Sequence, residues 1–186
     1  MIRFVPISEP ADFESKVRRR GMIWLSGNSD KRPKDFWKEC KSALANGFRN
    51  LCAYSAMYEP VGTVDHYFST KTHRHLAYEW SNYRYASGWI NSSKQDKVVL
   101  DPFQVDDGWF EIILPSLQLV ITAEVPQEKR QLAEYTLTSL HLCEDERVIR
   151  QRQEWYRMYL EEELSFAGLE KKAPLIARAV RKQMRV

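Results

Sequence analysis

The stretch that decides the fold begins with Thr63-Val64-Asp65-His66-Tyr67-Phe68 and ends with Asn91-Ser92-Ser93-Lys94. It carries one carboxylate, one imidazole and two carboxamides that matter for chemistry: Asp65, His66, Asn82 and Asn91. Carboxylate and carboxamide oxygens can hold a divalent metal, and a neutral histidine can accept a proton from water near pH 7. A metal beside such a base is the minimum equipment for hydrolysing a phosphodiester.

The same stretch is expected to fold as a strand, a loop and a helix. Residues 62–68 have the composition of a strand, and the polar residues 69–75 are typical of a loop. A capping residue, Ser81 or Asn82, can then begin a helix that runs to about residue 94. This order predicts that the first two polar groups lie on the strand and the last one on the helix.

Asp65 and His66 occupy adjacent positions of the expected strand. Side chains of adjacent strand residues point to opposite faces. A bulge or a local twist is therefore needed to bring this carboxylate and this imidazole to one site.

The rest of the chain predicts an α+β fold, with a small antiparallel sheet framed by N- and C-terminal helices. Further helices are expected at residues 11–20, 33–45, 127–140, 144–166 and 174–184, and short strands at residues 2–5, 51–54, 109–114 and 117–123. Without a repeat or a flexible linker, residues 1–186 are expected to form a single domain. Its helical C-terminal extension would begin at about residue 127.

Composition indicates an ordinary globular protein. The 186 residues are 44% hydrophobic and 12% aromatic, which is enough to bury one core. No signal-peptide pattern begins the chain, and its longest apolar run is too short to cross a bilayer. Cys40, Cys52 and Cys143 are odd in number and widely spaced, so we expect reduced thiols and a cytoplasmic location.

The distribution of charge suits contact with phosphate better than the net charge of +3 suggests. Arg18-Arg19-Arg20 forms one basic block, and the tail after Glu170 is basic without a single acid. Residues 144–163 hold most of the compensating acids. Each of these runs is also compatible with an ordinary solvated face.

The residues around the polar constellation resemble those of the HNH endonuclease family. Leu76-Ala77-Tyr78-Glu79-Trp80-Ser81-Asn82 is similar to its Tyr-Glu-Trp-x-Asn segment, and Asn91-Ser92-Ser93-Lys94 is similar to its Asn-x-x-Lys ending. Leu100-Asp101-Pro102-Phe103 resembles a Leu-Asp-Pro step that follows the motif in one bacterial subgroup. The resemblance covers about residues 51–103 and implies a ββα-metal core.

The resemblance also implies a role for each polar residue. Asp65 and Asn91 would bind Mg²⁺, Mn²⁺ or another divalent metal, and His66 would be the general base. Asn82 would complete the catalytic group by hydrogen-bonding across the loop and fixing the histidine. Products would carry 5′-phosphate and 3′-hydroxyl ends. The DNA phosphates would be bound by four cationic side chains near the motif: Lys71, Arg74, Arg84 and Lys94.

The sequence departs from the family where many members carry two Cys-x-x-Cys pairs that bind structural zinc. The matching residues are Cys52, Ser55, Ser87 and Ile90. Only one of the four is a thiol, so no structural zinc is expected. Asn91 also stands where other members carry histidine, which predicts a modest affinity for the catalytic metal.

We therefore expect a metal-dependent HNH endonuclease of bacterial or phage type that hydrolyses DNA. A chain of this size predicts low specificity, or work in a restriction or antiviral defence system beside a larger partner protein that supplies targeting. The basic C-terminal helix would then contact DNA or that partner. Two alternatives stay open: a catalytically inactive nucleic-acid-binding or assembly module on the same fold, and a nuclease acting on RNA.

Overall fold

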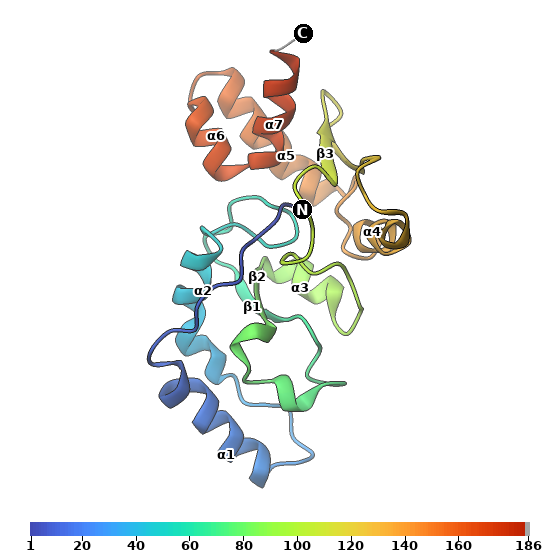
Figure 1. Ribbon diagram of the computed structural model, residues 1–186. Helices are drawn as coiled ribbons and strands as arrows, with labels where there is room; N and C mark the ends of the chain where they lie inside the picture. The colour runs from blue at the N-terminus through green and yellow to red at the C-terminus, as the bar shows by residue number, and fades with distance from the viewer. Residues whose placement is uncertain (185–186) are drawn as a thin grey trace.

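The computed structural model describes residues 1–184 and has a mixed α+β fold. Two separate antiparallel sheets, each of two strands, are set among helices. In Figure 1 the N-terminal helices and the first sheet form the lower part of the molecule, and the last three helices lie beside the second sheet in the upper part. The α+β class expected from the sequence is confirmed.

The N-terminal part is helical. A π-helical turn, η1 (Glu14–Arg18), leads into α1 (Arg19–Gly27), and a 3₁₀ turn, η2 (Phe36–Cys40), leads into α2 (Lys41–Gly47). The expectation that a helix stops before Gly21 is wrong, because α1 runs through it. A Cβ at Gly21 would lie 2.2 Å from the Cδ2 atom of Tyr78, so this glycine serves the close approach of an aromatic ring.

The central part contains a strand, a long loop, a strand and a helix. These are β1 (Thr63–His66), the turns η3 (Arg74–Leu76) and η4 (Trp80–Asn82), β2 (Tyr83–Ala86) and α3 (Gly88–Lys94). The strands pair antiparallel, with Asp65 opposite Arg84 and His66 opposite Tyr83, and α3 packs against β1. We call residues 63–94 the hairpin–helix unit.

Three further local expectations, also within residues 1–94, are wrong. Residues 83–86 form a strand and not the first turns of a helix, because pairing with β1 satisfies their backbone groups. Residues 51–54 form a turn that is closed by a single bridge from Leu51 to Tyr58. Residues 2–5 form no strand, although Ile2 and Phe4 are buried and the Phe4 amide donates to Pro102 O at 3.0 Å.

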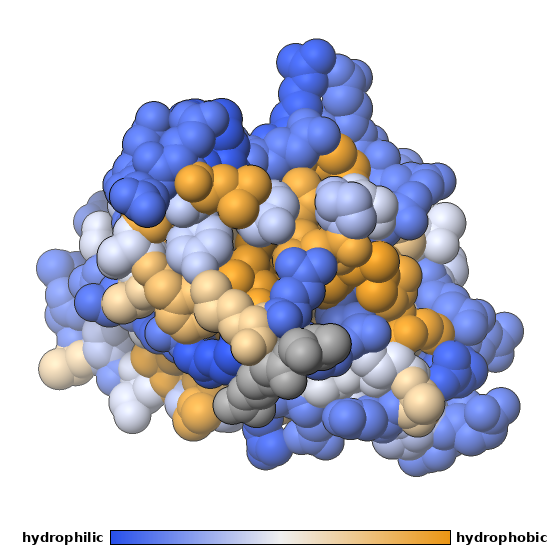
Figure 2. Space-filling view, turned by 90° about the horizontal axis from the view of Figure 1, so that it is seen from above, coloured by the Kyte–Doolittle hydropathy of each residue, from blue (hydrophilic) through white to orange (hydrophobic). Residues whose placement is uncertain are grey.

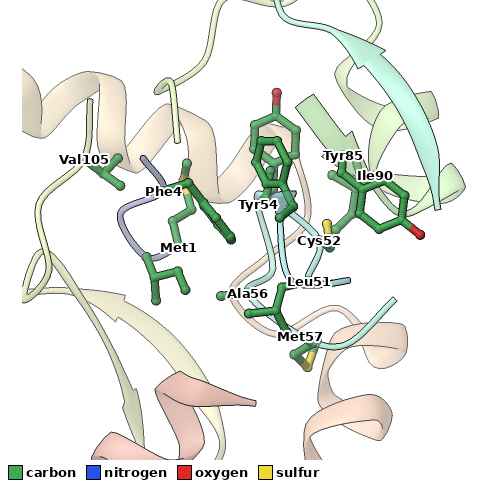
Figure 3. Close-up of a cluster of buried hydrophobic side chains, with 14 of the residues drawn as sticks. Met1, Phe4, Leu51, Cys52, Tyr54, Ala56, Met57, Tyr85, Ile90 and Val105 are labelled. Carbon is green, nitrogen blue, oxygen red and sulfur yellow. The ribbon is translucent and has the colours of Figure 1, made fainter. Parts of the chain in front are cut away.

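The core lies where the N-terminal segment meets the hairpin–helix unit. Figure 3 shows the side chains of Met1 and Phe4 beside the turn that carries Cys52 and Tyr54. Tyr54 is fully buried, although it lies in irregular chain. The turn between residues 51 and 57 thus fills the space behind the first sheet.

The C-terminal part follows the sequence pattern closely. It contains β3 (Phe110–Ile113), β4 (Gln118–Ile121), α4 (Gln127–Ser139), α5 (Glu146–Leu160), α6 (Phe166–Lys172) and α7 (Pro174–Gln183). The long helix expected at residues 144–166 is divided in two. The chain turns after Leu160, and the Ser165 side chain accepts a hydrogen bond from the Gly168 amide to begin α6.

Helix α7 buries its apolar face, and its cations form ion pairs within the chain. Arg178 pairs with Asp107, and Lys182 pairs with Glu111 on β3. Figure 2 views this end of the molecule from above and shows apolar residues gathered in the middle of the face, with hydrophilic residues around them. Within residues 1–184, no helix has both the length and the apolar character needed to span a bilayer.

Candidate functional site

His66 is the last residue of β1, and three contacts fix its imidazole ring. Its Nε2 atom lies 2.9 Å from the carbonyl oxygen of Ala77. The ring also meets the rings of Trp37 and Tyr83 edge-on, with centroids 4.6 Å and 5.1 Å away. A neighbour on β2 and another on η2 therefore hold the imidazole from two sides.

The contact with Ala77 decides the tautomer of His66. A carbonyl oxygen only accepts hydrogen bonds, so Nε2 must carry the proton and Nδ1 must carry the lone pair. Burial lowers the pKa of His66 below its usual value of 6.5, with the Ala77 contact and the neighbouring Asp65 acting in the opposite direction. The ring is therefore neutral at pH 7, with Nδ1 available as a base.

Asn82 ties the two ends of the loop together. Its Oδ1 atom accepts from the Phe68 amide at 2.7 Å, and its Nδ2 atom donates to Phe68 O at 3.0 Å and to Leu76 O at 3.1 Å. Leu76 O immediately precedes the Ala77 carbonyl that holds His66. The carboxamide thus hydrogen-bonds across the loop and keeps the acceptor of the imidazole in place.

Asp65 points away from His66, into the core. Its Oδ2 atom accepts from the Tyr54 hydroxyl at 2.6 Å, and its Oδ1 atom lies 3.2 Å from the Lys94 ammonium. The residue is only 1% exposed. No bulge interrupts the register of β1 and β2, so the alternation of the strand places this carboxylate and the imidazole on opposite faces.

Two of the four cations expected to bind DNA are buried, and that expectation is wrong for both. Lys94 is 0% exposed and forms the ion pair with Asp65. Arg84 is 3% exposed and makes a bidentate pair with Asp101, with Nε–Oδ1 at 2.8 Å and Nη2–Oδ2 at 2.7 Å. Both side chains organise the interior and are out of reach of a nucleic acid.

The other two expected cations line a surface cavity of about 860 Å³, together with His66 and Asn91. The cavity carries five cationic side chains and two carboxylates: Lys31, Arg32, Lys38, Lys71, Arg74, Asp30 and Asp35. Most of the five cations are exposed, so water and a ligand can reach them. Arg74 is half-buried, and its guanidinium also donates to Asn28 O at 2.6 Å.

Sequence reasoning missed the wall of the cavity that residues 29–38 contribute. This wall contributes Trp37, which contacts the imidazole, and the exposed side chains of Lys31 and Arg32. The only local signal was the Lys31-Arg32 pair before Pro33. Nothing in the sequence placed this segment opposite the loop at residues 69–74.

The residues do not fit the divalent metal that the family resemblance implies. Asn91 lines the cavity and donates weakly to Val64 O at 3.4 Å, but the carboxylate expected beside it is engaged by Tyr54 and Lys94. Within residues 1–184, no three His, Cys, Asp or Glu side chains lie close enough together to hold a metal. No catalytic step can therefore be derived through a metal from this arrangement.

Two of the positions that the resemblance matches to zinc ligands, Cys52 and Ser87, are in contact. The Ser87 amide donates to the Cys52 sulfur at 3.4 Å, and both residues are buried. Ser55 and Ile90 are buried as well, and Figure 3 shows Cys52 close to Ile90. Packing thus joins two segments that lie far apart in sequence.

Comparison with known proteins adds no relative. No protein family matches the chain, and no curated protein is similar enough to count as a match. The geometry of His66, Asn82 and the cavity is therefore the observation from which a function can be argued.

Proposed function

We propose that this protein is a nucleic-acid phosphodiesterase of the HNH type, with DNA as its substrate and His66 as the general base. One observation carries the proposal. A neutral imidazole is held by Ala77 O, Trp37 and Tyr83 and lines a cavity bordered by exposed cations. A poised base and a phosphate-binding surface meet at one place.

The order of elements supports the proposal. The hairpin–helix unit begins with a strand that ends in histidine, followed by a loop that an asparagine bridges. A second strand and a helix that carries an asparagine come next. The contact between Cys52 and Ser87 is a second support. Two positions assigned to the zinc knuckle by the resemblance, 35 residues apart, are neighbours in space.

The residues of the chain would act on a phosphodiester as follows. Lys71, Arg32 and neighbouring cations bind the phosphate and draw it to the cavity. His66 Nδ1 accepts a proton from the attacking water, while Nε2 keeps its proton in the contact with Ala77 O. As the water oxygen bonds to phosphorus the P–O3′ bond breaks, and the departing 3′ oxygen takes up a proton from solvent. That carbonyl dipole stabilises the imidazolium that forms, and Asn82 holds the loop that carries the carbonyl.

A cleavage assay with two histidine variants tests the proposal. Purified protein is incubated with plasmid DNA and with structured RNA, in Mg²⁺, in Mn²⁺ and in EDTA. We expect cleavage of DNA that falls by a factor of about 10² to 10⁴ in His66→Ala, the usual contribution of a general base. His75→Ala is the matched control, because His75 is an exposed histidine of the same loop outside the cavity.

Three outcomes decide the matter. Retained activity in a folded His66→Ala protein would refute the role of the base. Cleavage of RNA in preference to DNA would keep the site and change the substrate. Equal loss in His66→Ala and His75→Ala would show that the loop is perturbed and that the imidazole has no specific role.

A second function, a nucleic-acid-binding module without hydrolysis, is favoured by the pairing of Asp65 with Lys94. This ion pair removes the carboxylate that the resemblance gives to catalysis. The module would bind DNA without cleaving it under any of the three conditions. Lys71→Ala would weaken that binding, whereas Lys97→Ala, outside the cavity, would leave it unchanged.

A further inference from the structure

The ammonium group of Lys94 lies in a cage of oxygen atoms inside the hairpin–helix unit. It is 2.9 Å from His66 O, 2.9 Å from Tyr67 O and 3.2 Å from Asp65 Oδ1. A lysine ammonium has three N–H donors, so these three acceptors match its full donor capacity. The residue is 0% exposed.

The carboxylate of Asp65 is equally committed. One oxygen faces the ammonium and the other accepts from the Tyr54 hydroxyl at 2.6 Å. Burial and the neighbouring Asp65 raise the pKa of Tyr54 well above its usual value, so the hydroxyl stays a donor at neutral pH. The cage therefore contains one negative charge, one positive charge and no unmatched donor.

Lys94 reaches this place because α3 packs on β1. Asn91 lies one turn earlier on the same helix and meets the strand at Val64 O. The last turn of α3 then carries the lysine over the carbonyls at the end of β1. The backbone atoms that receive the ammonium include the carbonyl of the proposed base itself.

Oxygen cages of this composition are also what hard divalent cations prefer. A carboxylate oxygen and two backbone carbonyls would serve Mg²⁺ or Mn²⁺ as ligands if the ammonium were absent. With the ammonium present, a second cation at Asp65 would meet strong repulsion in an interior of low dielectric constant. Only one of the two cations can occupy the cage.

We propose that Lys94 is the resident cation of the hairpin–helix unit and occupies at Asp65 the place that the family resemblance gives to a divalent metal. The unit then folds without a metal. The charge of a bound phosphate is met by the exposed cations of the cavity wall. This inference goes beyond the proposed function and does not depend on it, because it concerns the occupant of the cage and not cleavage.

Removal of the ammonium should turn the cage into a metal site. In Lys94→Ala the three oxygens remain and space is opened for an ion. Binding of Mn²⁺ is measured by electron paramagnetic resonance, and thermal unfolding is followed in Mn²⁺ and in EDTA. We expect Lys94→Ala to bind Mn²⁺ at least tenfold more tightly than the natural protein does, and to unfold at a higher temperature in Mn²⁺ than in EDTA.

Two further variants show that the effect comes from the cage. The double variant Lys94→Ala/Asp65→Asn should lose the gain in Mn²⁺ affinity, because the carboxylate is gone. Lys97→Ala is the matched control, since it removes a nearby lysine whose ammonium donates only to Ser93 O and has no carboxylate partner within residues 1–184. It should bind Mn²⁺ no better than the natural protein.

Either of two results would overturn the proposal. One is a folded Lys94→Ala protein that gains no affinity for Mn²⁺. The other result comes from the natural protein, so it does not depend on the folding of a variant. Mn²⁺ is added while nuclear magnetic resonance signals are recorded, and the signals of Asp65 and Lys94 would broaden before any others if a metal enters the cage. Signals of both residues that stay sharp at millimolar Mn²⁺ support Lys94 as the occupant. Loss of nuclease activity in any variant bears only on the proposed function.

Discussion

Substitution of Arg84 by methionine tests whether this residue stabilises the interior or contacts DNA. The guanidinium forms the bidentate pair with Asp101, donates to Ser81 O at 2.7 Å and to Tyr83 O at 2.9 Å, and lies 3.8 Å from the centre of the Phe103 ring. Methionine keeps the apolar stem and removes every one of these polar contacts. Asp101 is left as a buried carboxylate without its counter-ion.

The size of the effect follows from burial. The side chains of Arg84 and Asp101 are only 4% and 7% exposed, so solvent does not screen the charge that remains. Removing one partner of a buried pair typically costs about 3–5 kcal/mol. That is a large fraction of the roughly 5–15 kcal/mol by which domains of this kind are stable. Arg84→Met should therefore raise the unfolded fraction by a factor of about 10² to 4 × 10³.

Urea unfolding followed by tryptophan fluorescence measures the loss, with an unchanged slope as the sign of an intact two-state transition. The control is Arg157→Met, which breaks exposed ion pairs to Glu154, Glu161 and Glu163 and should cost far less, because solvent screens these charges. Arg84→Met/Asp101→Asn should recover most of the stability, because Asn can still accept from the Phe103 amide. The structural role would be refuted if Arg84→Met lost no more unfolding free energy than Arg157→Met. It would also be refuted if Arg84→Met stayed folded but lost its affinity for DNA.

Three more predictions concern the fold, the base and the cavity. Gly21→Ala should cost about 1–3 kcal/mol of stability in urea because a Cβ would overlap the ring of Tyr78, whereas Gly27→Ala, with open space around it, should cost nothing. Burial lowers the pKa of His66, so as the pH falls the unfolded chain binds a proton at this residue before the folded protein does. The free energy of unfolding should therefore fall as the pH drops below about 6.5. His66→Gln should flatten this part of the curve of unfolding free energy against pH, measured from pH 8 to pH 5. Lys71→Ala should leave the urea midpoint unchanged, weaken DNA binding and reduce the slope of log affinity against log salt by about one, as measured by fluorescence anisotropy. A steady stability across that pH range in the natural protein, or an unchanged salt slope in Lys71→Ala, would contradict the second or the third prediction.

Local sequence patterns predicted the elements whose neighbours are close in sequence. The hairpin of β3 and β4 lies within the two segments expected to be strands, 109–114 and 117–123, and the turn expected at Pro115-Ser116 spans residues 114–117. Helices α4 and α7 also lie at the expected positions within a residue or two. In each case the signal and the structure depend on the same short segment.

Elements that depend on distant partners were not predictable in this way. Residues 83–86 have a pattern compatible with either a helix or a strand, and β1, some twenty residues away, decides for the strand. Trp37 contacts the imidazole only because the segment before α2 folds across the loop. A periodic pattern within one segment carries no information about contacts with segments far away in the sequence.

Burial separates the cations of this protein into two groups that their sequence neighbourhood does not distinguish. Lys71 and Lys94 both belong to the hairpin–helix unit, yet the first is exposed at the cavity and the second is enclosed. The difference arises from helix α3, whose last turn faces β1 and delivers its lysine to Asp65. Because that pair is electrically neutral and the imidazole is neutral too, the field in the cavity comes from its own charged side chains, in which five cations outnumber two carboxylates. Attraction of a nucleic acid to this site should therefore depend on salt and on Lys71 and Arg32.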